Sequence, residues 1–340
     1  MQQKIKAYYQ ATFADKQNIQ VSDPKRIADG WETEIFSFEI DYFLNGEPIH
    51  ENIIMRVFPG NDAYEKSAKE FSAMSQLYAV GYPVPQVYHL EQENSPWGKP
   101  FILMERIEGG IMWPQLVGSN AEKQEILLTQ FCGLFVQLHQ LDWRSFADDV
   151  SRYDLKNRYQ FIDNTLNEGA GMLDSFGLTG FLPVVEWLQQ RREGVPCDQP
   201  ALIHFDFHPG NVMLRPDETA VVLDWSGFDI SDARFDLAWT MVLFSSYEGS
   251  NWRDRILQTY EQVNGAAVEQ IEYFEVYACM RRLFSIVASV QGDAEKMGMD
   301  PNAVALMKEQ MYAHRRVYDL LIERTGIHIP EVEEMFAMIA

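Results

Sequence analysis

Two aspartates and an asparagine, set among short apolar runs, have the clearest chemical potential in this sequence. The segment His204-Phe205-Asp206-Phe207-His208-Pro209-Gly210-Asn211 contains the first aspartate and the asparagine, and Asp224 follows in Val221-Val222-Leu223-Asp224-Trp225. Transfer of a phosphoryl group to an alcohol needs a carboxylate near the accepting hydroxyl and oxygen ligands for Mg²⁺. We expect the short apolar runs to form strands that bring these side chains together.

The spacing of these residues matches a phosphoryl-transfer pattern. His204, Asp206 and Asn211 fit the kinase catalytic loop, H-x-D-x-x-x-x-N, and Asp224 fits the metal-binding aspartate that follows it. A rival interpretation starts from His204 and His208, because His-x-Asp-x-His could ligate a metal ion in a hydrolase. The rival leaves Asn211 and Asp224 without a role, and the sequence has no further histidine cluster. We therefore favour phosphoryl transfer.

Further motifs surround this loop. The nearest are Pro209-Gly210-Asn211 within it, Asp224-Trp225 in place of Asp-Phe-Gly, and Asp232 with Asp236-Leu237-Ala238 downstream. Together they resemble the aminoglycoside phosphotransferase and choline kinase superfamily. Weaker matches follow the family's order along most of the chain: Glu70, Leu77, Gly81, Pro83-Val84-Pro85, Phe101-Ile102-Leu103-Met104-Glu105 and Leu138-His139-Gln140-Leu141-Asp142.

The resemblance implies a role for each residue of the catalytic loop. Asp206 would be the catalytic base that orients the acceptor hydroxyl, and Asn211 and Asp224 would hold Mg²⁺. His204 would brace the loop through hydrogen bonds, and Asp236 would anchor it. A carboxylate of ordinary pKa is a weak base before reaction, so alignment of the hydroxyl would be the main contribution of Asp206.

The resemblance also implies a nucleotide site for ATP or GTP. Arg56 would contact the phosphates and pair with Glu70, although a solvated charge at the end of a strand has the same sequence signature. Gly30 would belong to the phosphate-covering loop of residues 29–33, where an ordinary strand turn would look the same. The adenine would lie against a hinge formed by Met104, Glu105 and Ile107.

The amino-terminal part has the pattern of strands interrupted by one helix. Residues 36–42 alternate between apolar and polar, residues 45–48 predict a turn, and residues 52–58 predict the returning strand. A helix is expected over residues 63–79, ended by Gly81 and Pro83. Two more strands are expected over residues 86–90 and 101–105.

The remainder is predicted to be mainly helical. Leu127, Phe131, Leu134, Leu138 and Leu141 mark one buried helix. Further helices are expected over residues 181–192, 234–244, 252–263, 266–290 and 303–322, and short strands over 201–203, 212–214 and 220–223. The sequence thus predicts an α+β, two-lobed protein-kinase-like fold, with a nucleotide-binding lobe over residues 1–106 and a catalytic, substrate-binding helical lobe over residues 107–340.

Composition limits the compartment and the partners. Hydrophobic residues make up 46% of the 340-residue chain and charged residues 23%, as in globular proteins. The 3 cysteines fit neither a disulfide framework nor a paired-thiol zinc site. No signal peptide or membrane span is evident, so we expect a cytoplasmic protein. The net charge of -22 argues against nucleic-acid and anionic-membrane partners and would attract a cationic substrate, although such acidity commonly serves only solubility.

The expected activity is ATP- or GTP-dependent phosphorylation of a hydroxyl on a small molecule. A catalytically silent nucleotide-binding module is an alternative, against which the complete set Asp206, Asn211 and Asp224 argues. The metallohydrolase is a less favoured alternative. Glu272 and Glu275 could face a cationic acceptor, although a solvated helix face is the more common explanation of such a pair.

Overall fold

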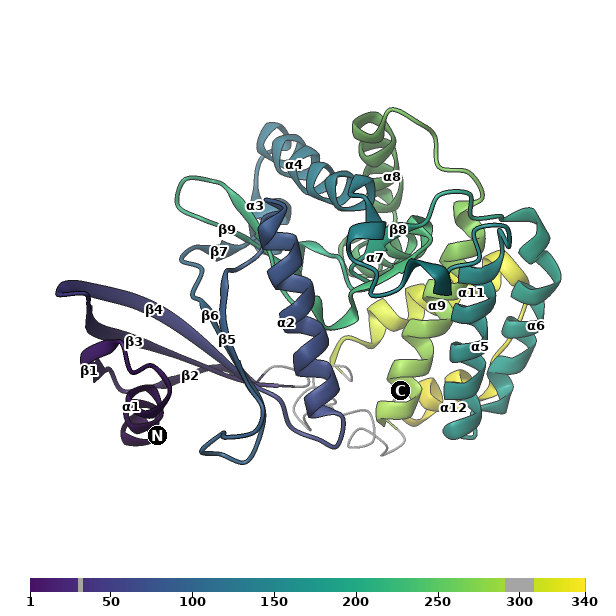
Figure 1. Ribbon diagram of the computed structural model, residues 1–340. Helices are drawn as coiled ribbons and strands as arrows, with labels where there is room; N and C mark the ends of the chain where they lie inside the picture. Colours follow the sequence, from purple (N-terminus) through teal and green to yellow (C-terminus); the bar gives the residue numbers. More distant parts are fainter. Residues whose placement is uncertain (30–32, 291–308, 340) are drawn as a thin grey trace. The chain divides into compact units, whose positions relative to one another are not determined.

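The computed structural model describes residues 1–29, 33–290 and 309–339. The chain folds into two units, one formed by Met1–Gly110 with Met213–Ser226, the other by Ile111–Val212 with Gly227–Ala340. The first is built on an antiparallel sheet and the second mainly on helices (Figure 1). The α+β class is therefore as predicted. The division at residues 106 and 107 into nucleotide-binding and catalytic lobes stays a prediction.

The sheet of the first unit has six strands. Its order is β1-β3-β4-β6-β5, and β2 pairs with β3 at the edge. Every pairing is antiparallel. The elements of this region are α1 Gln2–Thr12, β1 Lys16–Val21, β2 Lys25–Asp29, β3 Glu34–Leu44, β4 Glu47–Val57, α2 Ala63–Ala79, β5 Val87–Glu91 and β6 Phe101–Glu105.

The hairpin between β3 and β4 is tighter than predicted. Asn45 and Gly46 both have positive φ, at 54° and 88°, as a two-residue primed turn requires. Glu47 and Pro48, which were assigned to the turn, already pair with Leu44 and Phe43. The prediction of a four-residue turn is wrong because two residues suffice to reverse the chain, and the returning strand begins correspondingly earlier.

Helix α1, which the sequence patterns did not predict, packs on the sheet. Ile5, Tyr8 and Tyr9 are buried in one apolar cluster with Phe38 and Ile40 of β3. The helix is polar on average and has no side-chain cap, so neither its composition nor a capping signal marks it. Its apolar stripe against the sheet stabilises it.

Helices dominate the second unit. The segments predicted from residues 234 and 252 are confirmed, and α3, α5 and α12 were not predicted. In the described part of the chain, no helix combines the length and apolarity needed to cross a membrane. The helices are α3 Met112–Gly118, α4 Ala121–Gln140, α5 Gln160–Ser175, α6 Leu182–Arg191, α7 Ala233–Glu248, α8 Asn251–Asn264, α9 Ile271–Ala288, α11 Met311–Thr325 and α12 Pro330–Ile339.

One predicted helix start is wrong, and another lies outside the described residues. The helix expected from residue 266 begins at Ile271, because Gly265 ends α8 in the left-handed conformation and the chain must turn before α9. The helix expected over residues 303–322 falls partly outside the described residues, and its described part, α11, runs from Met311 to Thr325. Gly326, also left-handed, ends it.

Short strands flank the predicted catalytic loop. Strand β8 Ala201–Ile203 enters it and pairs with β11 Asp229–Ser231. Strand β9 Val212–Leu214 leaves it, and β10 Ala220–Val222 pairs with β9 in a small sheet that also contains β7 Gly110–Ile111. The three strands predicted around residues 201, 212 and 220 are thus confirmed.

The loop rests on the aromatic core of the second unit. The Phe207 ring stacks on Phe135 of α4, with ring centroids 4.2 Å apart and planes at 4°. Phe131 and Tyr260 extend the cluster at centroid distances of 5.1 Å to Phe207 and 5.6 Å to Phe135. Phe207 is fully buried, so its packing against these rings fixes the loop on the second unit.

This packing predicts that Phe135→Ala lowers the free energy of unfolding by about 3–5 kcal/mol, since the substitution leaves a cavity under Phe207. Urea unfolding followed by circular dichroism measures the change. Ile126→Ala on the exposed face of the same helix is the control and should shift the free energy by no more than about 0.5 kcal/mol. Equal, small effects of both substitutions would contradict the packing role.

Candidate active site

Two non-glycine residues beside the predicted catalytic carboxylates have a left-handed backbone. Phe205, next to Asp206, has φ of 66°, and Asp224 itself has φ of 62°. Such a conformation costs free energy for a residue with a Cβ and persists only where surrounding contacts enforce it. Backbone strain thus marks the two segments that the sequence motifs selected.

Asp236 holds the strained segment of the loop. Its Oδ2 accepts a hydrogen bond from the His204 amide and its Oδ1 from the Phe205 amide, both at 2.7 Å. Asp236 is fully buried on α7, and the ring of His139 lies 3.5 Å from its carboxylate. The carboxylate thus fixes two successive amides, which is the geometry required of the loop anchor that the sequence suggested.

The carboxylate of Asp206 is held at both oxygens. Oδ1 accepts a hydrogen bond from the indole nitrogen of Trp239 at 2.7 Å. Oδ2 accepts one from Nδ2 of Asn211 at 3.2 Å, and the same nitrogen donates to the Asp206 carbonyl at 2.9 Å. Nε2 of His208 lies 3.6 Å from Oδ2. These contacts restrict rotation of the side chain.

The charge state of Asp206 follows from opposing effects. Burial by itself would raise its pKa, but the His208 ring, the Arg281 guanidinium and the His204 ring together hold the pKa well below the ordinary value of an aspartate. The group is therefore an anion at neutral pH. As such it can align a hydroxyl by accepting its hydrogen bond, and it is a weak base until that proton becomes acidic.

The two histidines of the loop bind its backbone. Nδ1 of His204 accepts the Asp206 amide at 3.3 Å, and its fully buried ring meets Phe207 edge-on. Nδ1 of His208 accepts the Gly210 amide at 3.0 Å. Each ring thus uses one nitrogen inside the loop, as expected of the bracing residue His204. Within the described ranges, no three His, Cys, Asp or Glu side chains gather as a metal-binding group.

In the first unit, Arg56 connects two acidic side chains. Its Nη1 donates to Oε1 of Glu70 on α2 at 2.7 Å, and its Nη2 donates to Oδ1 of Asp224 at 3.0 Å. The side chains of Arg56 and Glu70 are 11% and 1% exposed, so Arg56 is not a solvated charge at a strand end. The expected pair of Arg56 and Glu70 is present. The guanidinium fork also includes Asp224, which the sequence did not indicate.

The position of Asp224 depends on the Pro-x-Pro turn after α2. The Pro83 carbonyl accepts a hydrogen bond from the Val222 amide of β10 at 2.8 Å. Trp225, fully buried, donates from its indole to the Val222 carbonyl at 3.0 Å and meets Tyr82 edge-on. These contacts fix the end of β10, from which the Asp224 carboxylate extends. The Pro-x-Pro turn therefore has a structural role.

Two of the predicted hinge residues, Met104 and Glu105, are the last residues of β6, and Ile107 follows the strand. Met104 and Ile107 are both 7% exposed. The Glu105 amide is already bonded to the Gln86 carbonyl at 2.8 Å, and its carboxylate accepts from Arg215 at 2.7 Å. Contact of Met104, Glu105 and Ile107 with a base stays a prediction. Gly30, the predicted phosphate-loop glycine, lies outside the described residues.

Asn211 and Asp224 have the chemistry of magnesium ligands. The Asn211 amide nitrogen donates to Asp206, which leaves its oxygen directed away from that carboxylate. The Asp224 side chain is 40% exposed. Amide and carboxylate oxygens suit a hard divalent cation such as Mg²⁺. Each side chain by itself therefore suits the metal, and their joint assignment as its ligands remains a prediction.

Two residues of the candidate site were missed by sequence reasoning. Trp239 on α7 and Arg281 on α9 lie beside the loop, and Arg281 donates to the Phe205 carbonyl at 2.6 Å. Trp239 follows Asp236-Leu237-Ala238 directly, and this proximity was the only available signal. Arg281 has no motif, because its position depends on how α9 packs.

One sequence suggestion is wrong. Glu275, considered as a contact for a cationic acceptor or as part of a solvated face, is fully buried and binds Arg253 at 2.6 Å and Arg324 at 2.9 Å. Its charge is neutralised within the unit. Glu272 is 56% exposed and lies 3.8 Å from Arg253.

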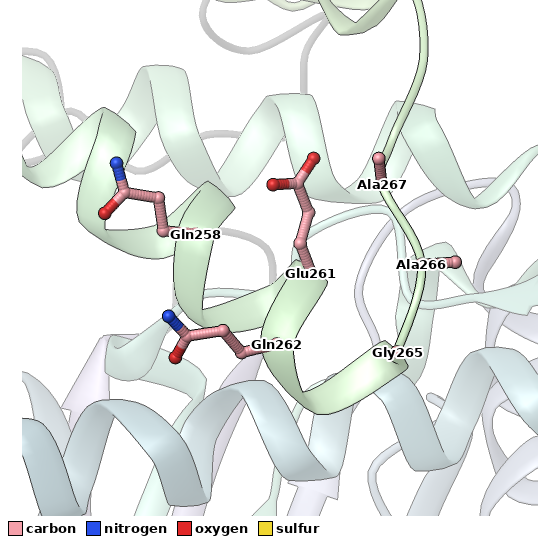
Figure 2. Close-up of a pocket in the computed structure, with 6 residues that line it drawn as sticks. All are labelled: Gln258, Glu261, Gln262, Gly265, Ala266 and Ala267. Carbon is pink, nitrogen blue, oxygen red and sulfur yellow. The ribbon is translucent and has the colours of Figure 1, made fainter.

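A hollow of about 450 Å³ lies elsewhere in the second unit (Figure 2). It is open to the surface at the end of α8, and none of its lining residues belongs to the predicted site. They are Gln258, Glu261, Gln262, Gly265, Ala266 and Ala267.

The anchor geometry predicts that Asp236→Ala lowers the free energy of unfolding by roughly 2–5 kcal/mol, because it leaves the two amides at His204 and Phe205 without their acceptor. Thermal and urea unfolding measure the loss. Asp229→Ala, which removes an exposed aspartate from the neighbouring strand β11, is the control and should change the free energy by about 0.5 kcal/mol or less. A loss no larger than that of the control would remove Asp236 from the anchor role.

Several solved structures have the same fold and are described as aminoglycoside phosphotransferases or as a choline/ethanolamine kinase family protein. A candidate aminoglycoside phosphotransferase from Ralstonia eutropha aligns with a TM-score of 0.66 and 16% identity over 94% of this chain and 98% of its own. ADP-bound aminoglycoside phosphotransferase APH(2'')-Ib aligns with a TM-score of 0.59 and 14% identity, covering 94% and 98%. A choline/ethanolamine kinase family protein from Mesorhizobium loti aligns with a TM-score of 0.58 and 16% identity. The alignment covers 94% of this chain and 92% of that protein. At these identities the similarity establishes the two-lobed, kinase-like fold.

Curated relatives match part of the chain. Acyl-CoA dehydrogenase family member 10 of Mus musculus is 27% identical over 201 residues, which is 52% of this chain and 16% of the relative. Acyl-CoA dehydrogenase family member 11 of Homo sapiens is 25% identical over 174 residues, which is 50% of this chain and 22% of the relative. The alignments thus span less than a quarter of the length of these relatives.

The family model supplies the assignment. The model of the phosphotransferase enzyme family matches residues 25–274, a span that contains the catalytic loop, Arg56, Glu70 and Asp224. That span is well over half of the chain. The chain therefore belongs to the phosphotransferase enzyme family.

Proposed function

We propose that this protein transfers the γ-phosphoryl group of ATP or GTP to a hydroxyl of a small molecule. The observation that carries the proposal is the Asp206 carboxylate, anionic and held at both oxygens within a loop of kinase spacing. A fixed anion beside the acceptor position aligns a hydroxyl for in-line attack and accepts its proton late in the reaction. Membership in the phosphotransferase family supports the same reaction class.

Each remaining residue has a part in the proposal. Arg56, paired with Glu70, would bind phosphate oxygens, and Asn211 and Asp224 would hold Mg²⁺. Bound there, Mg²⁺ would neutralise phosphate charge. Arg56 would have to exchange its contact with Asp224 for one with the nucleotide, and the buried Glu70 would retain the guanidinium during that exchange.

The co-substrate proposal has support from structural neighbours. Aminoglycoside phosphotransferase APH(4)-Ia has been solved with ADP and hygromycin B and with AMP-PNP and hygromycin B. Spectinomycin phosphotransferase APH(9)-Ia has been solved with ADP and spectinomycin. These complexes favour a nucleotide and a small molecule as the substrates of this chain. The Mg²⁺ ion and the acceptor hydroxyl are part of our proposal.

The acceptor and its compartment are part of the same proposal. The net charge of -22 favours a cationic acceptor over a nucleic acid or an anionic membrane surface. Glu275 does not contribute to such selectivity, because two arginines already neutralise it. We also propose that the reaction takes place in the cytoplasm.

Asp206→Asn is expected to lower kcat by at least about a hundredfold without changing nucleotide affinity, because the amide lacks the charge and the proton affinity of the carboxylate. A panel of hydroxyl-bearing metabolites and antibiotics, assayed for ADP release and for the phosphorylated product, measures turnover. Asp217→Asn, at an exposed turn, is the matched control. Full turnover by Asp206→Asn would refute the assignment, and nucleotide binding by the wild type without product would favour the silent module.

Arg56→Met is expected to weaken ATP binding by roughly tenfold or more, since it removes a charge-assisted contact with phosphate oxygens. Calorimetric titration with Mg²⁺ and a non-hydrolysable ATP analogue measures the dissociation constant. Lys99→Met, which removes a cation paired with Glu34 in the same unit, is the control and should leave the constant within about twofold. Equal affinity of both variants would exclude Arg56 from the nucleotide site.

A further inference from the structure

Resting on the proposed function, we propose that Trp239 and Arg281 are positioning residues that fix the Asp206 carboxylate in the orientation needed for phosphoryl transfer. Neither residue belongs to the kinase-spaced loop. Trp239 acts on the carboxylate directly, and Arg281 acts through Trp239 and through the backbone of Phe205. The two side chains come from different helices, α7 and α9.

Trp239 supplies a single, rigid donor. Its indole nitrogen donates to Oδ1 of Asp206 at 2.7 Å, a short distance typical of a charge-assisted bond. The side chain is 7% exposed, so water competes little for the carboxylate on this side. An indole has one N–H and cannot accept, which fixes the direction of the bond.

Arg281 braces both the donor and the strained backbone. Its guanidinium lies 4.1 Å from the centroid of the Trp239 ring and 4.2 Å from that of the Phe205 ring. Its Nη1 donates to the Phe205 carbonyl at 2.6 Å. Helices α7 and α9 are themselves joined by the edge-on contact of Phe235 with Phe274, at a centroid distance of 4.9 Å. The packing of these two helices therefore fixes the position of Arg281 relative to Trp239.

The arrangement locks one rotamer of Asp206. Rotation of the carboxylate would lose the bond from Trp239 at Oδ1, the bond from Asn211 at Oδ2, or both. Misplacement of an aligning group by a fraction of a bond length slows turnover while substrate binding persists. A merely structural pair would instead affect stability without a selective effect on kcat.

The first test is Trp239→Phe, which keeps an aromatic ring under Arg281 and removes the N–H. We expect kcat to fall roughly ten- to a hundredfold, while KM for the nucleotide stays within about twofold. The matched control is Trp252→Phe, because Trp252 is 5% exposed in the same unit and has Arg255 4.0 Å above its ring. A kcat for Trp239→Phe within twofold of the control would overturn the proposal.

A double-mutant cycle tests the coupling of the pair. Arg281→Met should also lower kcat, and the double variant Trp239→Phe/Arg281→Met should lose little more than the stronger single variant, because both act through one carboxylate. The control cycle with Trp252→Phe and Arg255→Met should show small, additive effects. Additive losses at Trp239 and Arg281 would overturn the joint role of the pair.

A spectroscopic measurement separates this inference from the proposed function. The indole N–H resonance of Trp239, assigned in ¹⁵N-tryptophan-labelled protein by its loss in Trp239→Phe, should shift in Asp206→Asn, while that of Trp252 stays unchanged. An unchanged Trp239 resonance would overturn the contact and with it the proposal. If the resonance shifts but Asp206→Asn retains full turnover, the proposed role of Asp206 fails, and the positioning role fails with it. A shift of the resonance, together with loss of turnover in both Asp206→Asn and Trp239→Phe, supports both the proposed function and the positioning role.

Discussion

The geometry of the loop from His204 to Asn211, the predicted catalytic loop, depends on one buried carboxylate, that of Asp236. Each of its oxygens accepts an amide of the loop, at His204 and at Phe205, and this pair of bonds offsets the cost of a left-handed Phe205. The reversal of the chain at Phe205 sends the next side chain, Asp206, toward Trp239 and the following one, Phe207, into the core against Phe135. A single anion thus directs Asp206, the proposed catalytic residue, and Phe207, which packs in the core, to different surroundings.

Arginines hold two other buried acids in the described part of the chain, Glu70 and Glu275. Arg56 joins Glu70 to Asp224 in the first unit, and Arg253 and Arg324 neutralise Glu275 in the second. A buried acid left without its partner would be strongly destabilising. The acids Asp224 and Glu275 differ in their exposure to solvent. Asp224 is partly exposed, whereas Glu275 is fully enclosed and serves the packing of the helices around it.

Local patterns predicted several elements well. Helix α2 has the bounds expected from the sequence, ending before Gly81 and Pro83, and the strands around the loop follow short apolar runs ended by turn residues. The start of α9 was missed because the apolar pattern continues backward through residues that the left-handed Gly265 diverts. Helix α1 was missed because its stability comes from the sheet beneath it, a contact that short-range periodicity does not encode.

The sequence by itself determined the order and spacing of the chemical groups: the loop from His204 to Asn211, the later Asp224, and Glu70 on its helix. Spacing is a local property of the chain, and motif recognition depends on it alone. Only the tertiary structure decided which groups hold the carboxylate of Asp206 and which acids are neutralised. Trp239, Arg281 and the partners of Glu275 come from distant helices, and their distances depend on long-range packing.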